Sequence, residues 1–332
     1  MKTYLIKKSD VEKALTMADC VRVTEEAFRL YGQDKTQMPP KSYLYFEDYF
    51  GDLRCMPAYI RDIGAAGIKA VNVHPDNRNA NLPTVMATIL LIDPKTGFPL
   101  AIMDGTHITN MRTGAAGGIA AKYLAKENST KAAFIGAGIQ AETQVMALNV
   151  TKPEIKTISI FDINQDAANN FAKFCADNFG MDATVAASIH DACAGADVIN
   201  CTTSSRKPIV MKDDVTPGAH INAIGADAKG KQEVDPAVLS NAKVVIDDWV
   251  QASHSGEINL PVSQGKLSEK DIAGELPKVV AGNLKLRTSD NDITIFDSTG
   301  LAIQDLMSAA HVYKLVTEGP DKDKLQTIEI FG

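Results

Sequence analysis

The stretch KAAFIGAGIQAE, residues 131–142, decides the fold of the second half of the chain. Its apolar start predicts a strand and its end predicts a helix, with Gly136, Gly138 and Ala141 in the G-x-G-x-x-G/A spacing between them. Gly136 permits a tight turn, Gly138 lets the backbone approach a pyrophosphate, and Ala141 keeps the helix close to the strand. Because a helix start presents free N–H groups, the stretch predicts a dinucleotide site.

The strand expected at 156–162 supports this prediction. It ends at Asp162, 24 residues beyond Gly138, where a carboxylate can accept hydrogen bonds from the adenosine ribose. The same carboxylate would repel a 2′-phosphate, so Asp162 favours NAD over NADP. A flavin, S-adenosylmethionine or a glycine turn without any ligand are the other interpretations of this pattern.

Strands and helices alternate from this stretch onward, which predicts an α/β fold with a Rossmann-type doubly wound parallel sheet. The first part of the chain differs, because one helix over 10–31 precedes consecutive strands at 42–46, 53–57, 67–73, 84–93 and 99–104. We therefore expect a strand-rich α+β domain over 1–125 and a nucleotide-binding domain over 126–300. The helical pattern at 301–319 predicts that residues 301–332 return to the first domain.

Composition excludes several classes of protein. The 332 residues carry a net charge of −7, whereas a nucleic-acid-binding protein needs a basic surface. No apolar run approaches the roughly 18 residues of a membrane span. The five cysteines form no CxxC pair, which favours reduced thiols, a cytoplasmic location and no metal site.

Two cations interrupt apolar strands in the first domain. Arg54 lies within GDLRCMPAYI (51–60) and Lys69 within AAGIKAVNV (65–73). An arginine can bind a carboxylate through two parallel hydrogen bonds, and a desolvated lysine with a lowered pKa can exchange protons near neutral pH. Lys41 and Arg112 are further candidates for binding a carboxylate or phosphate. The alternative is that such cations are edge-strand or surface residues.

Asp227 and Lys231 follow the apolar strand expected at 219–225. In a parallel sheet, ligands bind beyond the carboxyl ends of the strands, so these two residues are candidates for a site there. A solvated polar loop is the other interpretation.

Six segments together resemble the ornithine cyclodeaminase/μ-crystallin family. They are GIKAVNVHP, LPTVMATILLID with TGFPLAIMD, MRTGAAGGIAA, FIGAGIQA, HINAIGADAKGKQEVD and ITIFDSTGLAIQD, and they span nearly the whole chain. Within the family the chain is most similar to the archaeal-type alanine dehydrogenases, through QMPPKSYLYF, GDLRCMPAYI and GGIAAKYLA. The resemblance implies a homodimer, with the strand-rich domain serving substrate binding and dimerisation.

The resemblance also implies roles for individual residues. Lys69 matches the family's proton-transferring lysine, and Asp227 matches the acid that serves the cyclodeaminases as general acid and base. The positions that match substrate-contacting residues are Lys41, Arg54, Thr84 and Arg112. The positions that match NAD contacts are Arg112, Thr113, Gly136, Gly138, Ile139, Gln140, Asp162, Asn222, Ala223, Ile224, Lys231 and Ser298.

One position departs from the cyclodeaminase pattern. Where those enzymes carry a glutamate that binds the substrate amine, this chain carries Arg54. A cation there should repel the side-chain ammonium of ornithine, because like charges in a low-dielectric site repel strongly. The expected activity is therefore NAD-dependent, reversible deamination of L-alanine to pyruvate and ammonia. The alternatives are a cyclic imine (pyrroline-2-carboxylate or ketimine) reductase, an ornithine cyclodeaminase, and a non-catalytic μ-crystallin-like binding protein.

Overall fold

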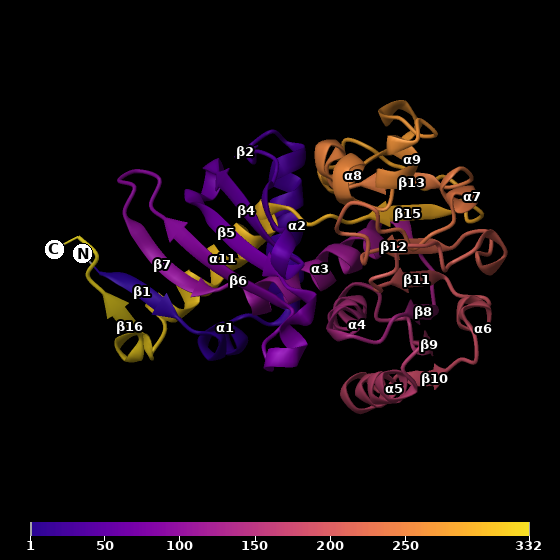
Figure 1. Cartoon of the computed structure of the whole chain (residues 1–332), viewed down its shortest axis with the longest axis horizontal. Helices are drawn as coiled ribbons and strands as arrows, with labels where there is room; N and C mark the ends of the chain where they lie inside the picture. Colours follow the sequence, from indigo (N-terminus) through magenta and orange to yellow (C-terminus); the bar gives the residue numbers. More distant parts are fainter. Residues whose placement is uncertain (1, 332) are drawn as a thin grey trace. The chain divides into compact units, whose positions relative to one another are not determined.

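The computed structural model describes residues 2–331, which form two compact units (Figure 1). Unit 1 comprises residues 1–112 and 301–332, and unit 2 comprises residues 113–300. Each unit is built around its own sheet, and one of the two sheets is wholly parallel. The predicted α/β fold class is therefore confirmed.

The sheet of unit 1 runs in the order β16-β1-β7-β6-β5-β4-β2, with β3 also paired to β4. Neighbouring strands are antiparallel except for the parallel pair β1–β7. The strands are β1 (Thr3–Ile6), β2 (Thr36–Gln37), β3 (Ser42–Phe46), β4 (Gly51–Ile60), β5 (Ala65–Val73), β6 (Val85–Ile92), β7 (Pro99–Asp104) and β16 (Gln326–Ile328).

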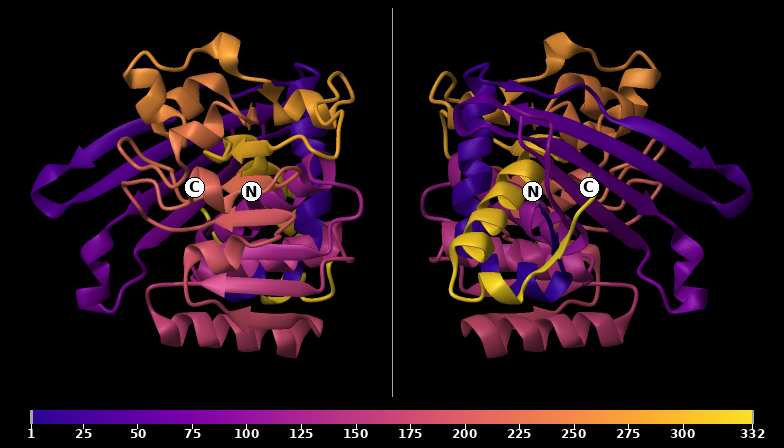
Figure 2. Two further views of the ribbon diagram at one scale, coloured as in Figure 1. Left: turned by 90° about the vertical axis from the view of Figure 1, so that its right-hand side faces the viewer. Right: turned by 90° about the vertical axis from the view of Figure 1, so that its left-hand side faces the viewer.

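The helices of unit 1 are α1 (Lys8–Ala14), α2 (Met17–Gly32) and α11 (Ala302–Glu318). Both α2 and α11 lie on the same side of the sheet (Figure 2), and α11 packs against β4, β5 and β6. The prediction of one helix over 10–31 is wrong. Thr16 adopts an extended conformation and its hydroxyl accepts a hydrogen bond from the backbone N–H of Asp19, so it caps a new helix instead of continuing the first.

The alternation of side chains along β4 and β5 decides which charges become buried. Met56 lies opposite Lys69, and Arg54 lies opposite Val71, so all four share one face of the sheet. These four residues are buried or nearly so, whereas Leu53 and its neighbours on the opposite face are partly exposed. The two interrupting cations therefore belong to the covered face of the sheet.

The sheet of unit 2 is parallel throughout, in the order β10-β9-β8-β11-β12-β15-β13-β14. Its strands are β8 (Lys131–Ile135), β9 (Thr157–Phe161), β10 (Asp182–Val185), β11 (Val198–Cys201), β12 (His220–Ala223), β13 (Lys243–Ile246), β14 (Gly274–Glu275) and β15 (Thr294–Asp297). Its helices are α4 (Ile139–Thr151), α5 (Gln165–Phe179), α6 (Ile189–Cys193), α7 (Pro236–Leu239), α8 (Trp249–Ser255), α9 (Asn259–Ser263) and α10 (Leu276–Val280). The helix α3 (Thr106–Leu124) starts in unit 1 and ends in unit 2.

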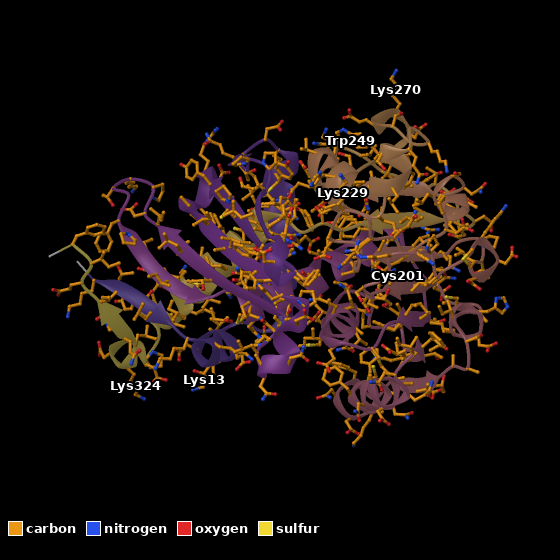
Figure 3. The ribbon with its side chains drawn as sticks, in the orientation of Figure 1. Lys13, Cys201, Lys229, Trp249, Lys270 and Lys324 are labelled. Atoms are coloured by element: carbon orange, nitrogen blue, oxygen red, sulfur yellow. The ribbon has the colours of Figure 1, made fainter. Side chains whose placement is uncertain are left out.

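Unit 2 has an apolar core on each face of its sheet, which is why its strands read as continuous apolar runs. On one face, Phe134 and Ile158 pack with residues of α4 and α5 such as Phe171. On the other face, Ile135 and Cys201 pack with residues of α6, α7 and α8. Figure 3 labels Cys201 within this sheet. Within residues 2–331, no helix is long and apolar enough to cross a membrane.

Candidate active site

A buried cluster of charges forms where β5, α3 and α11 meet in unit 1. The Lys69 ammonium donates a hydrogen bond of 2.8 Å to Asp305 Oδ1 and one of 3.2 Å to Thr109 Oγ1. Arg112 Nε donates to the same Asp305 oxygen at 2.9 Å. We call Lys69, Arg112 and Asp305 the lysine cluster. Its three side chains are at most 7% exposed, and it contains two cations for one carboxylate.

The surroundings of Lys69 bring its pKa into the range in which a lysine can exchange protons near neutral pH. Burial, and after it the positive charge of Arg112, lower the pKa of the Lys69 ammonium to about 7, while Asp305 acts in the opposite direction. The charge of Lys41, which lies just before β3, also lowers this pKa. Lys69 can therefore be either charged or neutral at neutral pH, as a general acid and base requires.

Asp305 is the residue of this cluster that sequence reasoning missed. It lies on α11, far from Lys69 in the sequence, and it is completely buried. Its signal was a carboxylate inside the apolar run LAIQDLM (301–307) of a predicted helix. Among residues 2–331, Asp305 Oδ2 has no hydrogen-bond partner. The cluster therefore keeps one carboxylate oxygen that can accept a further hydrogen bond.

Arg54 lies beyond the lysine cluster on the same face of the sheet. Its Nε and Nη2 atoms donate to the two carboxylate oxygens of Asp52 at 3.1 and 3.0 Å, and its guanidinium lies 5.7 Å from the centre of the Tyr43 ring. Sequence reasoning missed Asp52, two residues before Arg54 on β4. Because this pair is close to neutral, the repulsion between Arg54 and a substrate ammonium is weaker than the sequence suggested.

Thr84, the remaining candidate of unit 1, lies directly before β6. Its carbonyl oxygen accepts a hydrogen bond of 2.8 Å from the backbone N–H of His74, which closes the chain between β5 and β6. Nothing within unit 1 assigns its side chain a chemical role.

The glycine turn of unit 2 has the geometry of a phosphate site. Gly136 has φ +100°, and a Cβ there would lie 2.8 Å from Thr202 Oγ1. A Cβ at Gly138 would meet nothing within 4 Å, so its missing side chain leaves open space for a ligand. No side chain caps the start of α4, so its first N–H groups remain available to an anion. The residues present therefore fit a dinucleotide.

Asp162 holds this turn through both of its carboxylate oxygens. Its Oδ2 accepts a hydrogen bond from the backbone N–H of Ala137, and its Oδ1 accepts one from Asn164, both at 2.8 Å. Ile139, at the start of α4, is 55% exposed. The carbonyl of Gln140 accepts a bond from Thr143, and the carbonyl of Thr113 accepts one from Gln144.

The remaining nucleotide candidates lie at the carboxyl ends of β12 and β15. Asn222 is completely buried and donates to Gly117 O and Asn200 Oδ1, so its side chain is committed within the unit. Ala223 ends β12, and its carbonyl accepts the backbone N–H of Ser298. Ile224 follows and is 6% exposed.

Asp227 and Lys231 form an ion pair of 2.6 Å in the loop after β12. The Lys231 ammonium also donates to the carbonyl of Gly225 at 3.4 Å. Both candidates therefore lie in one loop of unit 2, as the sequence motif suggested, whereas Lys69 lies in unit 1.

A second buried cluster was missed altogether. Glu233, Glu257 and Asp297, which we call the carboxylate cluster, are completely buried in unit 2. Each accepts hydrogen bonds from backbone N–H groups: Glu233 from Thr203 and Gly225, Glu257 from Glu233 and Val234, and Asp297 from Glu257 and Ile258. Acids in a polar stretch such as GKQEVD look solvated in the sequence, so no signal there indicated burial.

Comparisons with known proteins show which proteins the whole chain resembles. Residues 1–320 match the model of the ornithine cyclodeaminase/mu-crystallin family. An alanine dehydrogenase of Archaeoglobus fulgidus is 49% identical over 314 residues, covering 95% of each chain. A solved archaeal alanine dehydrogenase dimer with bound NAD has a TM-score of 0.95 at 47% identity, with both chains fully covered. The Delta(1)-pyrroline-2-carboxylate reductase of Thermococcus litoralis, solved with NADH and L-proline, has a TM-score of 0.93 at 35% identity, covering 99% of this chain and 100% of the other.

Proposed function

The chain belongs to the ornithine cyclodeaminase/mu-crystallin family, and from this premise we propose that it is an NAD-dependent alanine dehydrogenase. It converts L-alanine and water to pyruvate and ammonia, and it runs the reverse reductive amination. The observation that carries the proposal is the fully buried Lys69, whose pKa is lowered to about 7, in a chain that also holds a complete dinucleotide turn.

Unit 2 is the part that holds NAD. The N–H groups at the start of α4 and the open space at Gly138 fit the pyrophosphate, and Asp162 fits the ribose without a 2′-phosphate. When bound, NAD accepts the hydride that leaves Cα of alanine. Ile139, Gln140, Arg112, Thr113, Asn222, Ala223, Ile224, Lys231 and Ser298 stay predicted contacts of this cofactor.

The chain's own side chains bind the substrate and move its protons. Arg54, oriented by Asp52, binds the carboxylate together with Lys41 and Arg112, and Thr84 lies beside the substrate. Neutral Lys69 takes a proton from the α-ammonium of alanine, which leaves a lone pair on nitrogen that drives hydride departure from Cα. Water then adds to the resulting iminium carbon, and Lys69 moves the protons that allow ammonia to leave. Asp227 stays a predicted second general acid and base, carried by unit 2.

We also propose that two copies of the chain form a dimer in a cytoplasmic enzyme. The solved archaeal alanine dehydrogenase of similar structure is a dimer. The five cysteines are unpaired, which agrees with reduced thiols.

A substrate panel followed by NADH absorbance tests this proposal. We expect NADH to form with L-alanine and not with L-ornithine. In the reductive direction, pyruvate with ammonia should be a better substrate than pyrroline-2-carboxylate. A clear preference for pyrroline-2-carboxylate would instead make the protein a cyclic imine reductase, as in its relative with 35% identity. Release of proline from ornithine would make it a cyclodeaminase, and NAD binding without any turnover would make it a binding protein.

Lys69→Ala tests the proposed chemistry. Loss of a general acid and base should lower kcat/KM for alanine about 10²–10⁴-fold. Lys152→Ala is the matched control, because Lys152 is also buried and its pKa is also lowered by burial, but its ammonium only bonds the carbonyls of Lys126 and Glu127. Equal losses in both variants would remove Lys69 from the mechanism.

A further inference from the structure

One buried side chain ties the loop that follows β12 to the segment after the neighbouring strand β11, in addition to the backbone bonds that Ile224 and Gly225 donate to the Cys201 carbonyl. Glu233 Oε1 accepts hydrogen bonds from the backbone N–H of Thr203 at 2.6 Å and from its hydroxyl at 2.7 Å. Glu233 Oε2 accepts one from the backbone N–H of Gly225 at 2.8 Å. Thr203 follows β11 and Gly225 follows β12, so a single carboxylate joins the carboxyl ends of two adjacent parallel strands.

The backbone at Gly225 is packed closely against Thr203 and Glu233. A Cβ added to Gly225 would collide with the Thr203 carbonyl and with the Glu233 carboxylate. Glu233 itself is 0% exposed, and its backbone N–H is held by both oxygens of Glu257 at 3.0 Å. The N–H of Gly225 is therefore shared between the Glu233 carboxylate at 2.8 Å and the Cys201 carbonyl at 3.2 Å, and the Glu233 bond is the shorter of the two.

Two residues further along, the same loop carries the proposed assisting acid. The backbone N–H of Asp227 donates to the Gly225 carbonyl at 3.1 Å, and Lys231 bonds both that carbonyl and the Asp227 carboxylate. Hydrogen bonds therefore link Asp227 to Gly225, and a further hydrogen bond links Gly225 to Glu233.

We propose that Glu233 is a positioning residue for the reaction: it holds the loop that carries Asp227 at the carboxyl ends of β11 and β12. This inference rests on the proposed function, because the role of Asp227 does. Glu233 takes no part in the proton transfers itself. It acts by keeping the Asp227 carboxylate in one fixed position within unit 2, because a displacement of about 1 Å of a group that takes part in a reaction can cost 100-fold in rate.

Glu233 has one carboxylate, one ammonium and one thiol among its neighbours. It faces Glu257 from the segment between α8 and α9, Lys231 from its own loop, and the Cys201 thiol from β11. Burial raises the pKa of Glu233 to about 7, while its hydrogen bonds from Thr203 and Gly225 act in the opposite direction.

Glu233→Gln tests the proposal. The amide keeps the size of the side chain, but its NH2 group cannot accept the hydrogen bond of Gly225 while its oxygen serves Thr203. We expect kcat for alanine to fall about tenfold or more, with the affinity for NADH nearly unchanged. Thr203→Val, which removes the hydroxyl's bond to Glu233 and the bond that this hydroxyl accepts from the backbone N–H of Ser205, should cause a smaller loss in the same direction.

A double mutant separates positioning from ordinary structural support. If Glu233 acts through Asp227, Glu233→Gln should reduce kcat in the wild-type background and should have little further effect in an Asp227→Asn background. Independent losses that multiply in the double mutant would overturn the proposal. Asp197→Asn is the matched control, because Asp197 also accepts two backbone N–H groups, from Thr130 and Lys131, but at the amino ends of β8 and β11. Its kcat should match the wild type.

Hydrogen exchange gives a readout that does not depend on activity. In Glu233→Gln, amides of residues 224–232 should exchange faster than in the wild type, while amides of β8 should not. Unchanged exchange in this loop would refute the role of Glu233 in holding it, even if the wild-type enzyme turns over alanine. If the wild type is inactive on alanine but Glu233→Gln still exchanges faster in this loop, the proposed substrate is refuted and the role of Glu233 in holding the loop is supported.

Discussion

Both units bury ionisable side chains completely, but the groups that stabilise these side chains differ. In unit 1 a buried charge is paired with a side chain of opposite charge, whereas in unit 2 buried carboxylates accept hydrogen bonds from backbone amides. In the lysine cluster, Lys69 and Arg112 share the single carboxylate of Asp305. In the carboxylate cluster, Glu257 and Asp297 are held by peptide N–H groups. Side-chain charges can be gained or lost with a proton, whereas peptide dipoles are permanent. The first arrangement can therefore perform acid–base chemistry, and the second can hold loops.

Removing one carboxylate from each cluster should have the largest effect and should expose this difference. Asp305→Asn removes the carboxylate that Lys69 and Arg112 share and leaves the buried Arg112 charge without its counter-charge, which should lower the free energy of unfolding by about 3–5 kcal/mol. Glu257→Gln keeps one oxygen for the N–H groups of Glu233 and Val234, and it removes a carboxylate that faces Glu233, so we expect a loss of about 1 kcal/mol.

Denaturant unfolding followed by circular dichroism and fluorescence checks this prediction. Trp249 is the only tryptophan and lies in unit 2, so its fluorescence reports that unit, whereas circular dichroism reports both. Figure 3 labels its position. Equal losses in the free energy of unfolding would contradict the comparison, because they would show that charge–charge and charge–amide contacts stabilise the two clusters to the same extent.

The pH dependence of turnover should show which cluster titrates. Lys69 must be neutral to accept a proton, so kcat/KM for alanine deamination should fall about tenfold per pH unit below its pKa of about 7 and level off above it. Asp305 raises this pKa, so Asp305→Asn should move the midpoint to lower pH. The folded pKa lies below the ordinary value of 10.5, so folding releases a proton between about pH 7 and 10.5. The contribution of Lys69 to stability therefore rises with pH across that window.

Glu233 is the control for this profile, because its pKa also lies at about 7. Glu233→Gln should lower the plateau and leave the midpoint in place. A midpoint that vanishes in Glu233→Gln and does not move in Asp305→Asn would assign the titration to unit 2 and break the comparison.

How much of this could be read from the sequence depends on the distance between partners. The glycine turn, Asp162 and the covered position of Lys69 follow from local spacing and alternation, so the fold class and the nucleotide turn could be predicted. Asp305 and Glu257 could not be paired with their partners, because those contacts join segments that only the fold brings together. Asp52 was missed for another reason, since an acid two residues from an arginine is common on any strand.

The Asp52–Arg54 pair is a largely buried pair of one cation and one carboxylate, and it lies outside both clusters. A substitution there should have the smallest effect. Arg54→Lys keeps the charge but loses the two parallel hydrogen bonds to Asp52 and the fork that suits a carboxylate. We expect KM for alanine to rise about fivefold to tenfold with kcat little changed, because a binding contact is weakened equally in the ground and transition states.

Arg29→Lys is the matched control for this variant. Arg29 forms the same two-pronged contact with Glu26 on α2, but the pair is exposed to solvent. Its substitution should leave both kinetic constants unchanged. A rise in KM for both variants would show that the effect is not specific to the substrate site.

The interrupted course of unit 1 along the chain also has a consequence for biosynthesis. Lys69 is separated from Asp305 by 236 residues, and the whole of unit 2 is translated between them. At cellular synthesis rates the nascent chain spends roughly 10–50 s with this lysine made and its carboxylate partner still missing. The lysine cluster is therefore among the last parts of the protein that can form, so a chain truncated before α11 contains the glycine turn but lacks the carboxylate partner of Lys69.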